Sequence, residues 1–456
     1  MSGWRKMPRR ARVGALAAIG AALAAACATV VPTVTSQEWQ TRAAPLSRGV
    51  IREEGGKRIQ VRYPIFGPPT NFEQWPTYAY GGPEYFPPRK GEMPKNVKGD
   101  PKKGHALIKD SAKGPCTACH VIPDATVWPA GNVGPDLRAF GARGLPDELV
   151  YQIVFDPRVL YGETTPMAPF GASGMWTPEE IVHVVAYLQS LKGNPPGQPE
   201  KVTDDPHWDP RTRPVVRPAY GDHLDITANP GLGFAHDLAV PLWTRAGPKG
   251  QSCASCHGPI GAPDAQRPLG VIGSMVGVGA RYPKWMAQYR RMMSVEDFLA
   301  VHAPETTGHE LPTQGDANLA MSILVRMQSN GMPYAMDLND PNVQAAIRRG
   351  EQTFNRRVGQ RGQACANCHT ERGGGGKFLG GRFLADVEKD AMVNHPYWRT
   401  AWQRVIDIRM RMQWCMTPLR ANMLPGDAPE YADLETFLIA KQTQRGDRVL
   451  VPRVSH

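Results

Sequence analysis

Three copies of the pattern Cys-x-x-Cys-His are the residues of this 456-residue chain most able to do chemistry. The copies are Cys116, Cys119 and His120, then Cys253, Cys256 and His257, and finally Cys365, Cys368 and His369. At this spacing two thiols on one helical turn can bond the vinyl groups of a c-type haem, and the adjacent imidazole can ligate its iron. The sequence therefore predicts three covalently bound haem c groups.

Zinc binding and thiol redox chemistry explain the same cysteines less well. A structural zinc site needs four ligands close together, but the three motifs are far apart in the sequence and each carries its own histidine. A thioredoxin-like site would not repeat the histidine after the second cysteine. We therefore prefer haem attachment at all three motifs.

A second axial ligand for each haem is expected from a loop at a common distance after its motif. Relative to the motif histidines, Met167, His302 and Cys415 stand at offsets of 47, 45 and 46. This agreement suggests three copies of one unit and predicts these residues as the distal ligands. The alternatives for the second haem are Met292, Met293 and His309.

Cys415 is unusual because no cysteine outside the motifs remains to pair with it once an export segment containing Cys27 is removed. A lone thiol is either buried and inert or held by iron, and the spacing favours iron. The second and third units also share a Pro-x-Trp segment. Pro283 precedes His302 by the same interval as Pro396 precedes Cys415, so the two ligand positions are equivalent.

Closing helices are predicted after each ligand. Residues 177–180, Thr-Pro-Glu-Glu, form a capping box before an apolar stripe, and residues 427–430, Asp-Ala-Pro-Glu, repeat the design. In the middle unit a helix is expected from Asp316 to Gly331.

We predict a mainly α fold of three cytochrome c-like haem domains in tandem, with long irregular loops because Gly and Pro number 47 and 44. The predicted segments are an export segment (1–36), an irregular extension (37–95), a first haem unit (96–194), a Pro-rich linker (195–220), a second haem unit (221–340) and a third haem unit (341–456).

The N-terminus has the pattern of an export signal. Residues 5–12 are basic, residues 13–31 carry no charge, and residues 26–28, Ala-Cys-Ala, fit a cleavage site. An uncleaved anchor and lipidation at Cys27 are the alternatives, and all three place the body of the chain outside the cytoplasm. The net charge of +11 includes five charges from this segment. No basic block of the kind that binds nucleic acid is present, so a nucleic acid partner is not expected.

The chain resembles the SoxXA cytochromes. The stretches 116–123, 131–135 and 166–171 are similar to the SoxX subunit, and residues 221–456 are similar to SoxA, most specifically at 415–420 and 428–435. The resemblance implies a periplasmic L-cysteine S-thiosulfotransferase that joins thiosulfate to a cysteine of the carrier protein SoxYZ. It departs from the family in the fusion of X before A, in the added extension, and in His302, where the dihaem family has a cysteine.

Four residues are candidates for the reaction itself. Cys415 can supply a reactive sulfur, and Arg411, one helical turn before it, matches the family's arginine and suits a sulfonate-like anion. Arg420 and Lys441 are further candidates. Thiolate ligation should lower the potential of the third haem and Met167 should raise that of the first, which would pass electrons to a small acceptor cytochrome c. The alternatives are a thiosulfate dehydrogenase that forms tetrathionate and a purely electron-transferring cytochrome.

Overall fold

The computed structural model describes residues 51–54, 57–60, 87–193, 224–227, 229–359, 361–399, 402–419, 421, 424, 426–452 and 454–455. The predicted export segment, the Pro-rich linker and most of the extension lie outside these residues. The described part of the chain is mainly helical, as expected, with small two- and three-stranded sheets. None of its helices is long and apolar enough to cross a membrane.

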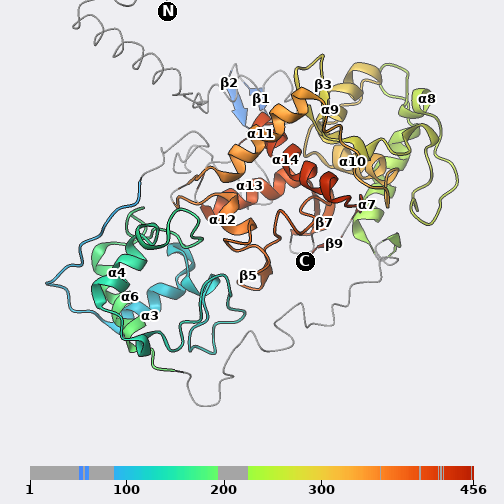
Figure 1. Cartoon of the computed structure of the whole chain (residues 1–456). Helices are drawn as coiled ribbons and strands as arrows, with labels where there is room; N and C mark the ends of the chain where they lie inside the picture. The colour runs from blue at the N-terminus through green and yellow to red at the C-terminus, as the bar shows by residue number, and fades with distance from the viewer. Residues whose placement is uncertain are drawn as a thin grey trace, which may run out of the picture.

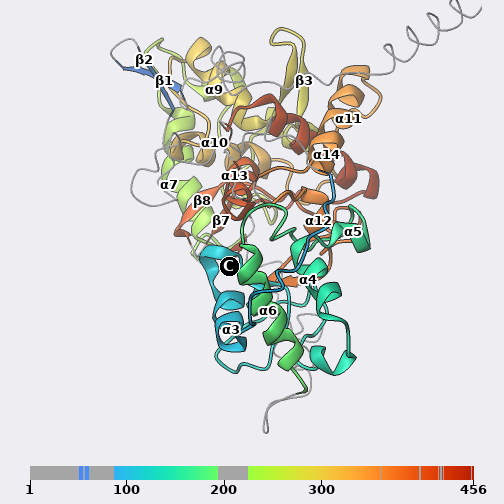
Figure 2. The same ribbon diagram turned by 90° about the vertical axis from the view of Figure 1, so that its left-hand side faces the viewer.

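The first haem unit is built on two crossing helices, α3 and α6 (Figures 1 and 2). Its elements are α3 (Pro101–Lys109), η4 (Ser111–Lys113), η5 (Cys116–Ala118), η6 (Phe140–Arg143), α4 (Asp147–Phe155), α5 (Arg158–Tyr161) and α6 (Pro178–Ser190). The predicted capping box of Thr177 and Glu180 is present at the start of α6. The crossing needs Gly104, because a Cβ there would lie 2.1 Å from the carbonyl oxygen of His183.

The second and third units repeat this plan with added hairpins. The second contains α7 (Pro230–Thr244), α8 (Cys253–His257), η9 (Gly273–Met275), η10 (Gly279–Arg281), β3 (Lys284–Met286), β4 (Arg291–Met293), α9 (Val295–Thr306) and α10 (Asp316–Met327). The third contains α11 (Pro341–Asn355), α12 (Cys365–His369), β5 (Phe378–Leu379), β6 (Arg382–Phe383), β7 (Tyr397–Arg399), β8 (Arg404–Ile406), α13 (Ile408–Leu419), α14 (Pro429–Arg445) and β9 (Val454–Ser455). A separate hairpin joins β1 (Ile51–Glu54) and β2 (Lys57–Gln60).

The predicted equivalence of His302 and Cys415 is visible in the backbone. In the second unit Trp285 pairs with Met292 across the β3–β4 hairpin, and in the third unit Trp398 pairs with Val405 across the β7–β8 hairpin. These two pairs are separated by the same number of residues as His302 and Cys415. The same separation relates two non-glycine residues with positive φ, Arg290 at 53° and Gln403 at 49°. The second and third units therefore carry one duplicated hairpin-and-helix element.

Three details of the predicted elements are corrected. His302 and Cys415 lie within helices α9 and α13 rather than in loops, whereas Met167 does lie in a loop. Helix α14 begins at Pro429 with Ala428 as its cap, so Asp427 is one residue too early to cap it. Helix α10 begins at Asp316, as expected, but it ends at Met327, before Gly331.

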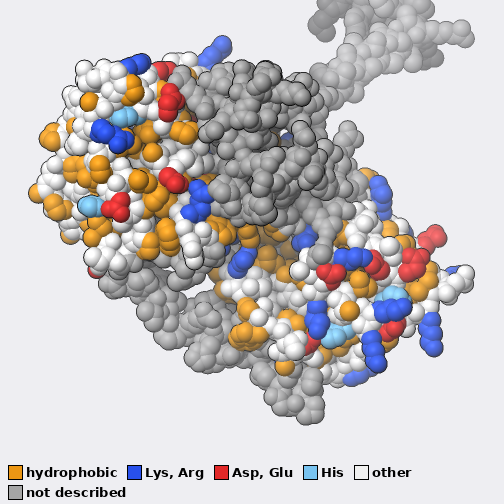
Figure 3. All heavy atoms as spheres, turned by 180° about the vertical axis from the view of Figure 1, so that it is seen from behind, with side chains coloured by type: hydrophobic (Ala, Val, Ile, Leu, Met, Phe, Trp, Pro, Cys, Tyr) orange, Lys and Arg blue, Asp and Glu red, His pale blue; other side chains and the backbone are white. Residues whose placement is uncertain are grey.

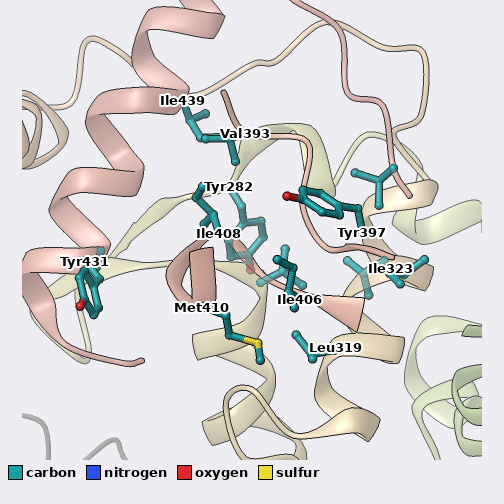
Figure 4. Close-up of a cluster of buried hydrophobic side chains, with 14 of the residues drawn as sticks. Tyr282, Leu319, Ile323, Val393, Tyr397, Ile406, Ile408, Met410, Tyr431 and Ile439 are labelled. Carbon is teal, nitrogen blue, oxygen red and sulfur yellow. The ribbon is translucent and has the colours of Figure 1, made fainter. Parts of the chain in front are cut away.

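One hydrophobic core spans the second and third units. Residues from both units pack together in it (Figure 4), including Tyr282 and Ile323 from the second and Tyr397 and Ile406 from the third. The first unit has a separate core. The predicted boundary at residue 340 falls at Asp340, the N-cap of α11, yet the buried apolar surface continues across it.

Charged side chains of both signs are interspersed on the face of the molecule seen from behind (Figure 3). On the first unit Lys and Arg side chains alternate with Asp and Glu, and apolar side chains are spread among them. The described residues of this face therefore present a mixed surface rather than one block of positive charge.

A buried group of charges ties α13 to its neighbours. The Arg409 guanidinium donates to the Asp297 carboxylate at 2.6 and 2.7 Å and to Glu435 at 3.0 Å. Arg326 donates to Glu296 at 2.9 Å, and all five side chains are buried. Buried charges in such a network are costly to separate, because removing one partner leaves another unpaired in the interior.

We predict that the unfolding free energy of the wild type falls as pH rises toward neutrality, and that Asp407→Asn abolishes this fall. Burial raises the pKa of Asp407 to about 6, and its carboxylate accepts from the Met410 amide at the start of α13. A raised folded-state pKa means that stability is full below the unfolded pKa and falls as pH rises through about 6. The wild type should lose about 2–3 kcal/mol of unfolding free energy over this range.

The asparagine keeps the acceptor for the Met410 amide and does not ionise, so its unfolding free energy should lack this decrease. Chemical denaturation of the holoprotein at a series of pH values measures it. Asp407→Ala is the matched comparison, because it also removes the acceptor and should destabilise α13 at every pH. An equal pH-dependent loss in wild type and Asp407→Asn would contradict the assignment.

Candidate haem and sulfur site

Each Cys-x-x-Cys-His motif forms a single helical turn that carries its histidine at or just beyond the end of the turn. The Nδ1–H of His120 donates to the carbonyl of Pro135 at 2.7 Å, and that of His369 donates to Ala385 at 2.8 Å. These bonds assign the proton to Nδ1 and leave Nε2 available for a metal. Both proximal histidines are therefore oriented as iron ligands.

Two glycines make room for the first motif. A Cβ at Gly134 would lie 2.1 Å from the His120 ring, and a Cβ at Gly131 would lie 1.8 Å from the carbonyl oxygen of Ala118. The amide of Gly134 also donates to the carbonyl of Cys119 at 2.8 Å. The Gly-Asn-Val-Gly-Pro segment thus packs closely around the attachment turn and its histidine.

In the second unit the imidazoles of His257 and His302 lie close together, with their planes inclined at 59°. The ring centroids of His257 and His302 are 6.1 Å apart. A metal–imidazole bond is about 2 Å long and the ligating nitrogen lies about 1 Å from the ring centroid, so one iron fits between the rings. Phe298 stacks on His302 at 4.8 Å and fixes its ring. The spacing supports His302 over its alternatives, and the His309 imidazole instead lies 3.1 Å from the carbonyl oxygen of Arg245.

In the third unit Cys415 lies on α13 near the attachment thiols. It is close enough to Cys365 and Cys368 to interact with both electrostatically. The seven described cysteines form no disulfide bonds. In the first unit Met167 packs against the core around α6. The paired imidazoles of the second unit fit a haem iron, and the residue types present in the first and third units are those that hold haem c.

Arginine and tryptophan side chains gather beside Cys415. The guanidinium carbons of Arg411 and Arg382 lie 4.4 and 4.7 Å from the ring centroid of Trp414. The Arg399 guanidinium lies 5.2 Å from the centroid of Trp402, whose ring is 6.1 Å from that of Trp414. We call Arg382, Arg399, Arg411, Trp402 and Trp414 the arginine–tryptophan cluster.

The arginine–tryptophan cluster favours an anion. Burial lowers the pKa of Arg382, and the charges of Arg399 and Arg411 lower it further, whereas Cys415 raises it. The Nη1 atom of Arg411 is buried and has no hydrogen-bond partner among the described residues. Like charges at close range are relieved by a bound anion, and an unpartnered buried N–H is an available donor.

The other two predicted residues lie differently. Arg420 lies outside the described residues. The Lys441 ammonium pairs with the Glu388 carboxylate at 2.7 Å and lies 5.7 Å from the ring centroid of Phe437. Sequence reasoning missed Arg382 and Arg399, which stand well before Cys415 in the chain and reach it only through the fold. The adjacency of Trp414 to Cys415 was the signal available.

Comparison with known proteins identifies the family of the second and third units. A family model for SoxA/TsdA cytochrome c domains matches residues 239–334 and 349–446. The L-cysteine S-thiosulfotransferase subunit SoxA of Pseudaminobacter salicylatoxidans is 31% identical over 222 residues, which are 48% of this chain and 71% of that protein. The chain belongs to the SoxA family of c-type cytochromes. SoxA of Rhodovulum sulfidophilum is 25% identical over 221 residues, 48% of this chain and 70% of its own.

The SoxXA structure from P. pantotrophus covers 52% of this chain and 82% of its own at 24% identity, with a TM-score of 0.42, too low to support a structural conclusion. The matched SoxA domains are the second and third units, so covalently bound haem c follows for the family region. The first unit lies outside the matched residues, and its haem stays a prediction.

The first unit docks on the haem-attachment turn of the third unit. Figures 1 and 2 both place it against α12. Asn367, within the third motif, donates through Nδ2 to the carbonyl oxygen of Thr165 at 3.2 Å. The Arg357 guanidinium pairs with Glu163 at 2.8 Å, and the Gln363 amide donates to the carbonyl of Pro166. The third unit therefore holds the segment that leads directly to Met167.

We predict that His302→Met changes only the middle haem. Replacing an imidazole by a thioether should raise that haem's potential and remove the spectroscopic signature of two histidine ligands. Redox titration and electron paramagnetic resonance of the holoprotein measure both effects. His309→Ala is the control and should change neither, because its ring is bonded to Arg245. An unchanged middle haem in His302→Met would contradict this ligand.

We predict that Asn367→Asp weakens methionine ligation in the first unit. The aspartate keeps the oxygen that accepts from the Ala364 amide at 2.8 Å, but it loses the donor to the Met167 segment and places a carboxylate against its carbonyls. The sulfur-to-iron charge-transfer band of the ferric protein should diminish and the potential of the first haem should fall. Asn355→Asp makes the same change at an exposed residue of α11 and should leave both the band and the potential unchanged. An intact band in Asn367→Asp would show that this contact does not support the ligand.

Proposed function

We propose that this chain is a trihaem, periplasmic SoxXA-type L-cysteine S-thiosulfotransferase. Its substrates are thiosulfate and the cysteine thiol of a SoxYZ-like carrier protein. A bond forms between the terminal sulfur of thiosulfate and the cysteine sulfur, the thiol proton is released, and two electrons leave. Haem c, when bound, supplies one-electron acceptors for these electrons, and a small acceptor cytochrome c removes them. The N-terminal segment is a cleaved signal or a membrane anchor.

The arginine–tryptophan cluster beside Cys415 is the observation that carries this proposal. Thiosulfate is a small dianion, and a guanidinium can donate two parallel hydrogen bonds to a sulfonate-like group. The buried Nη1 of Arg411 offers such a donor close to a reactive sulfur. Binding and orienting thiosulfate with its terminal sulfur toward Cys415 is the role we give to Arg411.

The duplicated second unit supports a substrate-binding role for the cluster because it lacks these residues. At the equivalent positions of the second unit, Met286 replaces Arg399, Phe298 replaces Arg411, and Val301 replaces Trp414. The same backbone element therefore accommodates an apolar surround at His302. The shared backbone element therefore does not require arginine at these positions, which supports a role in anion binding for the arginines of the third unit.

The different predicted axial ligands give the three units different roles in the proposed reaction. Cys415 is the sulfur ligand at the anion site, and Met167 belongs to the first unit, which docks on the third. Thioether ligation favours a higher potential than thiolate ligation, so electrons should pass toward the first unit and leave from it. His302, together with His257, gives the middle haem two nitrogen ligands, so we assign this unit no sulfur chemistry.

The test is electron transfer from thiosulfate to an acceptor cytochrome c, with purified holoprotein in the presence and absence of the carrier. Reduction only with carrier, and a carrier mass increased by one thiosulfate, supports the proposal. Reduction without carrier, with tetrathionate formed, identifies a thiosulfate dehydrogenase instead. No reduction in either case leaves an electron-transfer cytochrome. Cys415→Met should abolish turnover, and full activity in that variant would contradict the catalytic assignment.

We predict that Arg411→Ala raises KM for thiosulfate roughly tenfold to a hundredfold, as expected for loss of a charge-assisted hydrogen bond. Arg411→Lys should restore part of the affinity, because it keeps the charge without the planar fork. Arg348→Ala is the control, since it removes one arginine from the exposed face of α11. Steady-state kinetics at fixed carrier concentration measures KM. An unchanged KM in Arg411→Ala would exclude it from the anion site.

A further inference from the structure

The β5–β6 hairpin touches both the first haem unit and the site of Cys415. It lies on the side of the third unit that faces the first unit (Figure 1). Its strands pair Phe378 with Phe383 and Leu379 with Arg382, and Gly380 and Gly381 form the turn with φ of 51° and 76°. A two-residue turn with positive φ at both positions has a fixed geometry. The position of Arg382 therefore follows that of the turn.

Hydrogen bonds from backbone and side-chain groups fasten this hairpin to the first unit. The amide of Phe378 donates to Oδ1 of Asn132 at 2.7 Å, and the amide of Asn132 donates back to the carbonyl of Phe378 at 3.0 Å. The amide of Gly380 donates to the carbonyl of Ala118, inside the first attachment motif, at 2.8 Å. The Lys377 ammonium donates to the carbonyl of Val133 at 3.2 Å.

Arg382, the residue that follows the Gly380–Gly381 turn, lies in the arginine–tryptophan cluster. Arg382 places its guanidinium 4.7 Å from the ring centroid of Trp414, the ring that also carries Arg411. Among the described residues, no carboxylate lies within ion-pair distance of Arg382 or Arg411. Two guanidinium groups on one indole ring, with no protein carboxylate paired to them among the described residues, can bind a dianion together.

We propose that Arg382 is a second binding residue for the substrate anion and that the docked first unit holds it in place through the β5–β6 hairpin. This inference rests on the proposed function and extends it. Arg411 approaches from α13 and Arg382 from the hairpin, so the two can contact different oxygens of one sulfonate-like group. Thiosulfate affinity is then a property of both the third unit and its junction with the first.

The packing at the junction explains how a small displacement would be felt. A Cβ at Gly381 would lie 2.4 Å from the side chain of Pro129, so the turn is in close contact with the first unit. Arg382 directly follows Gly381. A shift of the first unit therefore moves Gly381 and, with it, Arg382. Arg411 is held independently, because the buried ion pairs of Arg409 anchor α13.

The experiment measures, by titration calorimetry, the equilibrium binding of thiosulfate to the oxidised holoprotein without carrier. Arg382→Ala should weaken binding roughly tenfold or more, and Arg382→Lys should recover part of the loss. Arg348→Ala, which removes an equal charge from α11, should bind as the wild type does. An unchanged affinity in Arg382→Ala, with binding lost in Arg411→Ala, would overturn the inference while leaving the proposed function intact.

A double-mutant cycle tests the coupling. Asn132→Ala removes the acceptor for the Phe378 amide without touching the anion site, and should weaken binding several-fold. In the Asn132→Ala, Arg382→Ala double variant the effects should not add, because Asn132 acts only through Arg382. Lys377→Ala is a second junction variant with the same expectation. Additive effects, or no effect of either junction variant, would overturn the coupling.

Absence of thiosulfate binding to the wild type would instead contradict the proposed function. That result is distinguishable, because Arg411→Ala would then show no loss relative to wild type. Retained weak binding of sulfate, equal in wild type and Arg382→Ala, would likewise exclude Arg382 from an anion site of any kind. Binding of thiosulfate that depends on Arg411 alone places the anion on α13 only.

Discussion

The buried pairing of Arg409 with Asp297 and Glu435 is the interaction on which the placement of α13, and with it of Cys415, depends. It joins α13 to α9 of the second unit and to α14 of the third, in an interior where an unpaired charge would be costly. Arg411 and Cys415 lie further along the same helix, within two turns of Arg409. Their position is therefore set by ion pairs that lie elsewhere on the same helix and its neighbours. The middle unit contributes to the site by holding α13, whatever its haem does.

Duplication followed by substitution explains how one backbone element serves two purposes. The hairpin and helix around His302 and around Cys415 share their register and their positive-φ turn residue. Only the side chains differ, with Phe298 stacked on the ligand in one copy and Arg411 beside it in the other. A hydrophobic surround excludes an anion because a charge in it would lack partners. The two copies thus place an apolar surround at His302 and a cationic one at Cys415 without a change of fold.

Local patterns in the sequence predict the parts that depend on local physics. The attachment motifs, the capping box at Thr177 and the equivalence of His302 with Cys415 follow from spacing along the chain. The repeated motif suggests Asp427 as a helix cap, but Pro429 starts the helix and leaves Asp427 one residue out of reach. Arg382 and the pairs of Arg409 could not be predicted, since they join segments far apart in sequence through tertiary packing.

The junction between the first and third units relies largely on backbone carbonyls as acceptors, including those of Ala118, Val133 and Thr165. Such acceptors exist at every residue, so no sequence motif reveals the interface. Individual hydrogen bonds of this kind contribute little net free energy, and a free partner would need many of them or a large apolar area. Fusing the units in one chain makes docking intramolecular and raises the effective concentration of one unit at the other. A polar junction is then sufficient to hold both the Met167 segment and the β5–β6 hairpin, so one interface contacts the segment of the predicted distal ligand on one side and the hairpin of the arginine proposed to bind substrate on the other.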